Sequence, residues 1–351
     1  MRPSVDPAGS PRGRSGLSAL VLAALMALAP ALVTAAAAES AVSTPINAEE
    51  LRIWLMRIQQ ASGLHSFQGT FVVSGGGTVS SARVAHFCEG KNQFERIDSL
   101  DGVERHVFRH NNVVHTVWPQ SRVALVEQRE QAVSFLGTVG TGGERIVDHY
   151  DVRRQGSDRV AGHEAGVLLL KPRDGYRYGY RLWSERSSGL LLRADVLNAK
   201  GEVLETSAFS NVVIGVRPQP DSVMLRMKSL DGYRVIRPVL VPTRLESEGW
   251  ALRDTPPGFR LVSCIKRPLG PSDADRADDI QALQSIYSDG MTYVSLFIEP
   301  YDARRHTQEM LTAVGATQTL MRRHGDWWVT VMGDVPSRTL NSFASGLERS
   351  K

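Results

Sequence analysis

The stretch DGYRYGYRLWSERSSGLLLRADVLNAKGEVLE, from Asp174 to Glu205, decides the fold of this 351-residue chain. Its first half alternates with period two, so the tyrosines share one face of a strand and the arginines share the other. Turn residues at 187–189 and 198–201 separate this strand from two further apolar strands. The pattern predicts an antiparallel meander. The side chains expected on one side of the second strand are Leu190, Leu192, Ala194 and Val196.

The tyrosine face allows more than one interpretation. The rings of Tyr176, Tyr178 and Tyr180 could stack nucleic-acid bases. The next strand presents leucines rather than lysines, which favours a wall of a hydrophobic core or cavity. Periodicity alone leaves open whether that wall packs solid or encloses a ligand.

The same strand pattern starts earlier in the chain. Short apolar runs between Phe67 and Glu127 are separated by the turn sequences EGKN, DG, NN and PQSR. Helices do not alternate with these strands, so a doubly wound nucleotide-binding fold is excluded. The glycine-rich segment 137–143 interrupts the strands and is interpreted as a lid or a loop beside the sheet.

One helix is predicted over residues 48–62. Asn47 is a suitable N-cap because Glu50 follows three residues later. An apolar stripe at helical spacing follows, which must lie on another surface. Its residues are Leu51, Trp54, Leu55 and Ile58. We expect a half-open antiparallel β-barrel wrapped round this helix.

The amino terminus has the pattern of an export signal. Three arginines precede an apolar run from Leu17 to Ala38, with Ala36 and Ala38 at a small-residue cleavage site. We therefore expect a cleaved signal peptide over 1–38 and an exported protein, with an uncleaved membrane anchor as the alternative. Its loss removes three Arg and one Asp, so the net charge falls from +4 to +2. This weak, dispersed charge does not indicate a nucleic-acid partner.

The chain is long enough for two domains. We predict a large domain over 39–215, a proline-marked linker over 216–245 and a smaller α+β domain over 246–351. In the small domain a helix is expected near Thr307–Val314. Another helix is expected after Pro336, with Leu340, Phe343 and Leu347 in its apolar stripe.

Catalytic and metal-binding patterns are weak, so neither an enzyme, a cofactor nor a metal is expected. The S-x-x-K match from Ser263 to Lys266 reads as a strand and lacks its companion elements. Three histidines are clustered, but they fall on a predicted hairpin with spacing that suits a metal poorly. They are His106, His110 and His115.

The two cysteines, Cys88 and Cys264, fall in different predicted domains. Export makes a disulfide between them a candidate. Two buried free thiols are the favoured alternative.

Several segments resemble one known family. They are LDGVERHVFRHNNVVHTVWPQSR, RVAGHEAGVLLLKPRDGYRYGYRLWSERSSGLLLRADVLNAKGEVLE, PPGFRLV, YSDGMTYVSLFIEP and TVMGDVPSRTL. They look like the periplasmic sigma-E regulatory proteins RseB and MucB. The resemblance implies a LolA/LolB-like large domain and a partner, the periplasmic segment of a RseA/MucA-like anti-sigma factor. It also implies that the protein shields this segment from the DegS protease and that lipopolysaccharide or another acyl lipid displaces it.

Candidate residues follow for two surfaces. The lipid-cavity candidates are Trp54, Leu55, Ile58, Phe67, Phe71, Tyr178 and Leu192, for each of which a packed core is the alternative. The partner-binding candidates are Tyr293, Phe297, Glu299, Trp327 and Trp328. Adjacent tryptophans place one ring on each face of a strand, so one could be an exposed anchor unless both are covered.

A periplasmic lipid or lipoprotein carrier is the alternative function. A simple carrier does not need the second domain, which favours the regulatory protein. An exported hydrolase lacks a nucleophile–base pair. The sequence leaves open the identity of the lipid and whether the protein forms a homo-oligomer.

Overall fold

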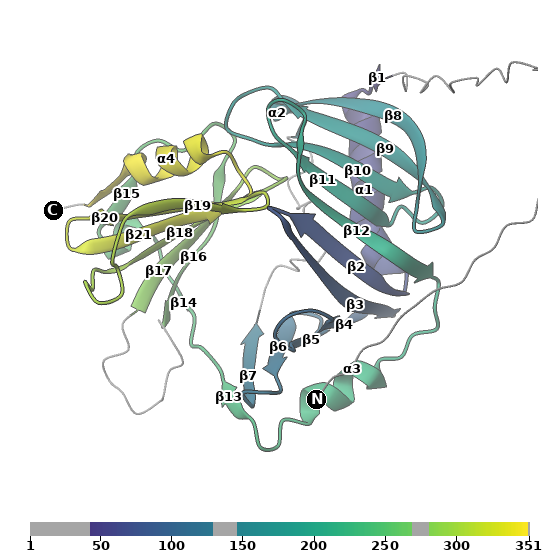
Figure 1. The fold of residues 1–351 in the computed structure, drawn as a ribbon, viewed down its shortest axis with the longest axis horizontal. Coiled ribbons are helices and arrows are strands. Elements are labelled where there is room, and N and C mark those ends of the chain that lie inside the picture. The colour runs from purple at the N-terminus through teal and green to yellow at the C-terminus, as the bar shows by residue number, and fades with distance from the viewer. Residues whose placement is uncertain (1–42, 129–145, 269–280, 350–351) are drawn as a thin grey trace, which may run out of the picture. The chain divides into compact units, whose positions relative to one another are not determined.

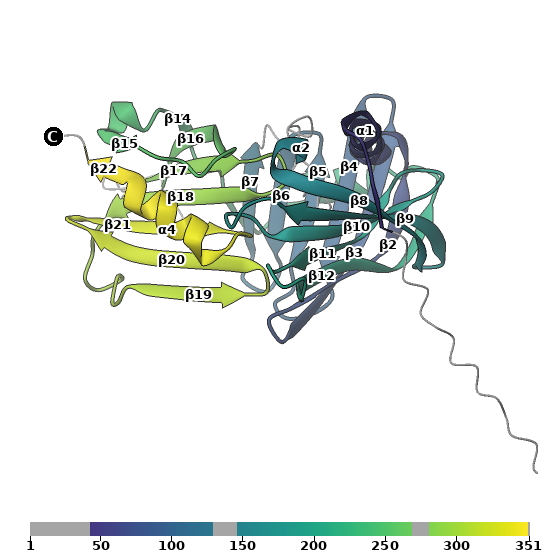
Figure 2. The same cartoon turned by 90° about the horizontal axis from the view of Figure 1, so that it is seen from above.

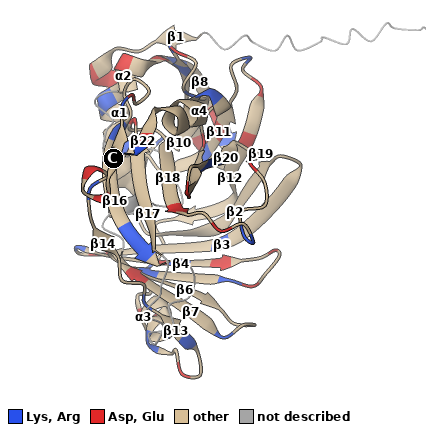
Figure 3. Cartoon of the chain, turned by 90° about the vertical axis from the view of Figure 1, so that its left-hand side faces the viewer, with Lys and Arg blue, Asp and Glu red and all other residues tan. Residues whose placement is uncertain are grey.

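The computed structural model describes residues 43–128, 146–268 and 281–349 (Figure 1). The predicted signal peptide 1–38 and the glycine-rich segment 137–143 lie outside these ranges. Within them, no helix is long and apolar enough to cross a membrane. Lys and Arg residues are distributed over many separate elements of the ribbon (Figure 3), which agrees with the dispersed charge of the sequence.

The first sheet has 13 strands, ordered β1-β8-β9-β10-β11-β12-β2-β3-β4-β5-β6-β7-β13. Its neighbours pair antiparallel except β13, which runs parallel to β7. The predicted antiparallel meander is confirmed, and the sheet is open rather than a closed barrel. Its strands are β1 (Thr44–Pro45), β2 (Phe67–Gly75), β3 (Thr78–Glu89), β4 (Asn92–Ser99), β5 (His106–His110), β6 (Val113–Trp118), β7 (Val123–Gln128), β8 (Tyr150–Val160), β9 (His163–Pro172), β10 (Gly179–Glu185), β11 (Leu191–Leu197), β12 (Val203–Ile214) and β13 (Arg234–Ile236).

Helix α1 (Ala48–Leu64) begins where the sequence predicts. The Asn47 side chain accepts a hydrogen bond from the Glu50 backbone N–H at 2.8 Å, which satisfies one free donor of the first turn. The buried face of α1 carries Leu51, Leu55 and Ile58, which pack with side chains of β8 to β11. The predicted helix against an apolar sheet face is therefore present.

The β10–β11 hairpin differs from the predicted alternation. A register shift follows Trp183, where an irregularity lets two residues of one strand oppose one of the other. Leu191, Ala194 and Val196 consequently share a cluster with Tyr180, whereas Leu190 and Leu192 belong to another cluster. The prediction that Leu190 and Leu192 share a side with Ala194 was wrong, because a single strand sequence does not reveal a bulge.

The second sheet has seven strands, ordered β14-β16-β17-β18-β21-β20-β19. Helix α4 (Ser337–Gly346) lies along β20 and β21 and buries Leu340 and Phe343, as predicted (Figure 2). A small sheet pairs β15 (Trp250–Leu252) with β22 (Leu347–Arg349). The prediction that Leu347 belongs to the helix was wrong, because this residue pairs with Leu252 in that sheet, although it is still buried. The seven strands are β14 (Val241–Pro242), β16 (Arg260–Pro268), β17 (Gln281–Ser288), β18 (Tyr293–Pro300), β19 (Met310–Val314), β20 (Thr317–His324) and β21 (Trp327–Gly333).

The helix predicted near Thr307–Val314 is wrong, since this segment contains strand β19. All five residues of β19 pair with β20 around a turn at Gly315, whose φ of +59° suits glycine. An isolated helix this short has little stability, whereas the hairpin satisfies the same backbone groups against a neighbouring strand.

The predicted linker 216–245 holds more structure than expected. Helix α3 (Asp221–Lys228) buries Val223 and Met227 against the β4–β7 part of the first sheet. Strand β13 joins the first sheet and β14 joins the second. The short elements α2 (Ile146–His149) and η2 (Glu246–Glu248) complete the described chain. The described chain is mostly sheet with few helices, so the predicted α+β class holds only in part, and the domain boundaries stay predictions.

Candidate functional site

Four lipid-cavity candidates lie in one apolar cluster, which we name the tyrosine cluster. Leu55, Ile58 and Tyr178 are buried members, and Trp54 packs against it partly buried. Each is packed in the structure, which is the alternative left open by the sequence. The buried members of the cluster are Leu51, Leu55, Ile58, Ile146, Tyr150, Val152, Leu168, Leu170, Tyr178, Tyr180, Leu182, Leu191, Ala194, Val196, Met291 and Ala316.

The other three lipid-cavity candidates, Phe67, Phe71 and Leu192, lie in a second cluster with Phe209. Phe209 contacts both phenylalanine rings edge-on, with ring centroids 5.9 Å from Phe67 and 5.1 Å from Phe71. The predicted set is thus divided between two neighbouring clusters of the first sheet. Its role in lipid binding stays a prediction.

Three partner-binding candidates share one face of β18. Tyr293, Phe297 and Glu299 are half-buried and alternate with the buried residues Val294, Leu296 and Ile298. The buried side packs with Leu340 and Phe343 of α4, so the candidates point away from that helix. The Glu299 carboxylate pairs with Arg305 at 3.1 Å.

The two rings of the tryptophan pair are packed to different degrees. Trp328 is 5% exposed, and the His306 ring stacks on it with centroids 4.7 Å apart and an interplanar angle of 7°. Trp327 lies on the opposite face, edge-on to Trp250 at 5.6 Å and under the Arg349 guanidinium. Trp328 is therefore covered, whereas Trp327 is packed but only half-buried, and the role of either ring in partner binding stays a prediction.

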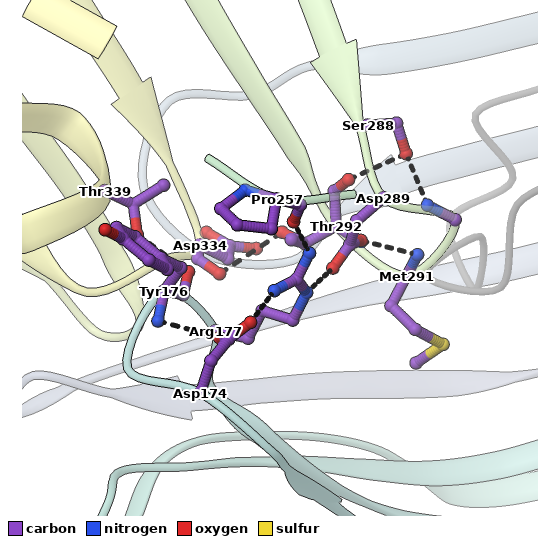
Figure 4. Close-up of polar contacts among 11 residues, drawn as sticks. Asp174, Tyr176, Arg177, Pro257, Ser288, Asp289, Met291, Thr292, Asp334 and Thr339 are labelled. Atoms are coloured by element: carbon purple, nitrogen blue, oxygen red, sulfur yellow. Dashed lines mark hydrogen bonds and ion pairs between the residues drawn. The ribbon is translucent and has the colours of Figure 1, made fainter. Parts of the chain in front are cut away.

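A buried arginine that the sequence did not single out connects the two sheets (Figure 4). The Arg177 side chain is fully buried, and its Nε donates to Asp289 Oδ2 at 2.6 Å. Its two terminal nitrogens donate to Asp174 Oδ2 and to the Pro257 carbonyl. The guanidinium also lies over the Phe259 ring, 5.1 Å from the centroid. Such a buried charge is tolerated only when it is fully paired, as it is here.

The partner Asp289 also shapes the loop between β17 and β18. Its second oxygen, Oδ1, accepts the backbone N–H of Met291 at 2.9 Å and of Thr292 at 3.0 Å. Ser288 Oγ accepts from Gly290 N–H and donates to the Thr292 carbonyl (Figure 4). One carboxylate thus both holds Arg177 and fixes the loop that carries Met291.

The chain approaches Arg177 closely at Gly258, whose φ is +87°. A Cβ at this position would overlap His149 and Arg177, so only glycine fits. Burial and the Arg177 charge lower the pKa of His149, although the Asp289 and Asp174 carboxylates oppose the shift. The neutral imidazole is therefore favoured beside the guanidinium.

Further contacts join the sheets around this arginine. Thr339 Oγ1 of α4 donates to the Tyr176 carbonyl at 2.7 Å. The Ala316 backbone N–H donates to Glu205 Oε2 at 3.3 Å, and burial raises the pKa of Glu205. The connection is thus a set of specific polar contacts around the apolar side chain of Met291.

Cys88 and Cys264 do not form a disulfide with each other in the structure. Cys88 lies on β3 and Cys264 on β16, in different sheets. Burial raises the pKa of both thiols, which lowers their reactivity. Among the described residues, no group of three or more His, Cys, Asp or Glu could hold a metal ion.

Sequence reasoning missed the Arg177 site for an identifiable reason. Period-two alternation placed Arg177 on the face opposite the tyrosines, but strand β10 starts only at Gly179. Its partner Asp289 is 112 residues away in the sequence. The D-x-x-R spacing from Asp174 is the one local signal, and by itself it matches an ordinary turn.

Comparisons with known proteins agree over most of the chain. Residues 50–227 match the MucB/RseB N-terminal domain, and residues 244–348 match the MucB/RseB C-terminal domain. The sigma factor AlgU regulatory protein MucB of Pseudomonas aeruginosa is 30% identical over 303 residues, or 83% of this chain and 88% of that protein. The sigma-E factor regulatory protein RseB of Escherichia coli K12 is 24% identical over 296 residues, or 84% and 89%.

Solved structures show the same relation. A crystal structure of MucB in complex with MucA(peri) has a TM-score of 0.64 at 27% identity and covers 86% of this chain and 99% of that one. A LolA superfamily protein from Nitrosomonas europaea has a TM-score of 0.24, which is too low to support an argument about the fold. Because both halves match the family in order and a relative is 30% identical over most of the chain, this protein belongs to the MucB/RseB family of sigma-factor regulatory proteins.

Proposed function

We propose that this protein is a periplasmic negative regulator of an envelope-stress response. In this proposal it binds the periplasmic segment of a transmembrane RseA/MucA-like anti-sigma factor and shields it from regulated proteolysis. Lipopolysaccharide or another acyl lipid then releases it. The observation that carries the proposal is the family match over both domains, with a relative whose crystal structure contains MucA(peri).

The first sheet supports the lipid part of the proposal. It packs two apolar clusters against helix α1, which contributes Leu51, Leu55 and Ile58 to one and Ala61 to the other. Burying about ten methylenes contributes on the order of 8 kcal/mol before the costs of ordering and association. The remaining affinity is in the micromolar range, which suits a reversible sensor.

The second sheet supports the partner part. The face of β18 that points away from α4 carries two aromatic residues, Tyr293 and Phe297, with Ser295 midway between them. The charged side chain of Glu299 lies at the end of the same face. Half-buried aromatic side chains of this kind are the usual anchors of a bound peptide. Because Trp328 is buried and Trp327 is engaged by Trp250 and Arg349, we place the anchors on β18 rather than on β21.

The partner-binding test compares two truncations with one control. Phe297→Ala and Tyr293→Ala should each weaken binding of the periplasmic segment of the organism's own RseA/MucA-like anti-sigma factor by tenfold or more, because each removes about 1.4 kcal/mol or more. Leu311→Ala on β19 is the matched control, since Leu311 is 50% exposed on the same sheet. Isothermal titration calorimetry measures the affinities.

Folding of each variant is checked by its thermal unfolding curve. If the two aromatic variants bind the segment as tightly as Leu311→Ala does, the β18 face is not the binding surface. If the wild-type protein does not bind the segment at all, the proposed function itself is wrong.

A further inference from the structure

Met291 is the starting point, because it belongs to one sheet and is buried in the other. It lies in the loop between β17 and β18 of the second sheet. Its side chain is 0% exposed and is a member of the tyrosine cluster of the first sheet. Ala316, in the turn between β19 and β20, is the only other buried member that the second sheet contributes among the described residues.

The loop holds Met291 in a fixed position. Asp289 accepts two backbone N–H groups of the loop, one of them from Met291 itself. Gly290 takes a φ of +99°, which lets the loop turn tightly enough to point Met291 toward the cluster. The second oxygen of Asp289 pairs with buried Arg177, which precedes β10. The loop is therefore fastened to the first sheet at the point where Met291 enters it.

The chemistry of Met291 makes it a substitute for lipid. Its side chain is unbranched, flexible and apolar, like a short piece of acyl chain. Protein interiors are close-packed, so an added chain needs a resident side chain to leave. Residues of α1 and the first-sheet strands are part of the enclosing wall, whereas Met291 can leave together with its loop.

The tyrosine cluster also contains a buried polar group. The Tyr150 hydroxyl is buried in the tyrosine cluster and has no hydrogen-bond partner among the residues the structure describes. An unpaired buried hydroxyl costs free energy that a partner would recover. A carboxyl or ester oxygen of an acyl ligand could accept this hydrogen bond.

We propose that Met291 is a built-in plug that occupies the acyl-chain site of the first sheet, and that the Asp289–Arg177 pair holds the plug in place. An acyl chain and the contact between the two sheets then compete for one volume. This inference rests on the proposed function and adds how lipid binding reaches the second sheet. Lipid entry expels Met291, strains its loop and loosens the sheet that carries Tyr293 and Phe297.

The test measures binding of cis-parinaric acid, a fatty acid whose fluorescence rises in apolar surroundings. Met291→Ala removes the plug and Asp289→Asn weakens its fastening, so both variants should bind the probe about tenfold more tightly than the wild-type protein. Met291→Leu keeps the volume, and Met332→Ala changes a methionine that is 37% exposed on the same sheet. Both controls should bind like the wild-type protein.

A second measurement, of methionine methyl resonances, uses the wild-type protein and so does not require any variant to fold. In wild-type protein with ¹³C-methyl methionine, saturating probe should shift the Met291 methyl resonance and leave that of Met332 in place. Equal probe affinity in Met291→Ala and wild type, or an unmoved Met291 resonance at saturation, overturns the plug while the lipid-sensing function stands. If no form of the protein binds the probe, the acyl-lipid part of the proposed function fails and the plug fails with it.

Discussion

At the scale of single residues, the Arg177 site should dominate the stability of the contact between the sheets. Arg177→Met leaves two carboxylates and the Pro257 carbonyl without their buried donor. We expect the free energy of unfolding to fall by about 3–5 kcal/mol, because the partners stay buried and unpaired. Urea unfolding followed by circular dichroism measures the change.

The matched control is an exposed ion pair. Arg186 pairs with Glu164 at 3.3 Å, with side chains 77% and 73% exposed, so Arg186→Met should cost below about 1 kcal/mol. The double variant Arg177→Met/Asp289→Asn should recover part of the loss, since it removes one of the stranded charges. If Arg177→Met and Arg186→Met lower the free energy of unfolding equally, the buried network contributes no more to stability than an exposed ion pair.

The role of a residue could be predicted where its contacts are close in the sequence. It could not be predicted where its contacts are distant in the sequence. Asn47 was identified as an N-cap because its partner Glu50 is three positions away. Arg177 and Met291 were not identified, because their neighbours lie in another sheet and one sequence carries no information about such pairs. The packing of the tryptophan pair depends on other parts of the chain in the same way. Trp328 stacks with His306, and Trp327 contacts Trp250 and Arg349.

At the scale of elements, the β10–β11 turn depends on one carboxylate. Glu185 accepts hydrogen bonds from the backbone and hydroxyl groups of both Ser187 and Ser188. Burial alone raises the pKa of Glu185, but these hydrogen bonds outweigh it and lower the pKa to about 2 from an ordinary 4.5. A lowered carboxyl pKa stabilises the fold above the unfolded pKa, and the stabilisation is lost as the carboxylate is protonated.

The wild-type protein should therefore be more stable than Glu185→Gln at neutral pH. The difference should be constant above about pH 5 and should shrink as the pH falls from about 4.5 toward 2. Chemical unfolding at a series of pH values measures it. Ser188→Ala removes a hydroxyl donor and should weaken the pH dependence, and a difference that does not change with pH would refute this account of the turn.

Element type followed from periodicity wherever neighbouring segments pair with each other. The strands from β2 to β7 and from β9 to β12 follow the alternation and turn signals of the sequence. Two of the predictions that proved wrong have clear structural causes. A bulge after Trp183 moved Leu192 to another cluster, and hairpin pairing made 310–314 a strand rather than a helix.

At the scale of the whole molecule, the order of strands around α1 could be expected from the meander, and the fastening of one sheet to the other could not. The family match assigns both halves of the chain. The structure adds a physical connection, made by Met291, Asp289 and Arg177, between the apolar interior of the first sheet and the sheet that carries the proposed peptide-binding face. In this account the same contacts that hold the sheets together are the ones lipid must break.

Proteolysis of the anti-sigma periplasmic segment by a DegS-type protease, with this protein and increasing lipopolysaccharide, tests the central claim most directly. Cleavage should slow several-fold or more when the protein is added, because in the proposed complex the segment is bound on β18 and is kept from the protease. Cleavage should recover as lipopolysaccharide saturates the first sheet. A cleavage rate that the protein leaves unchanged, or protection that lipopolysaccharide does not reverse, would contradict the account.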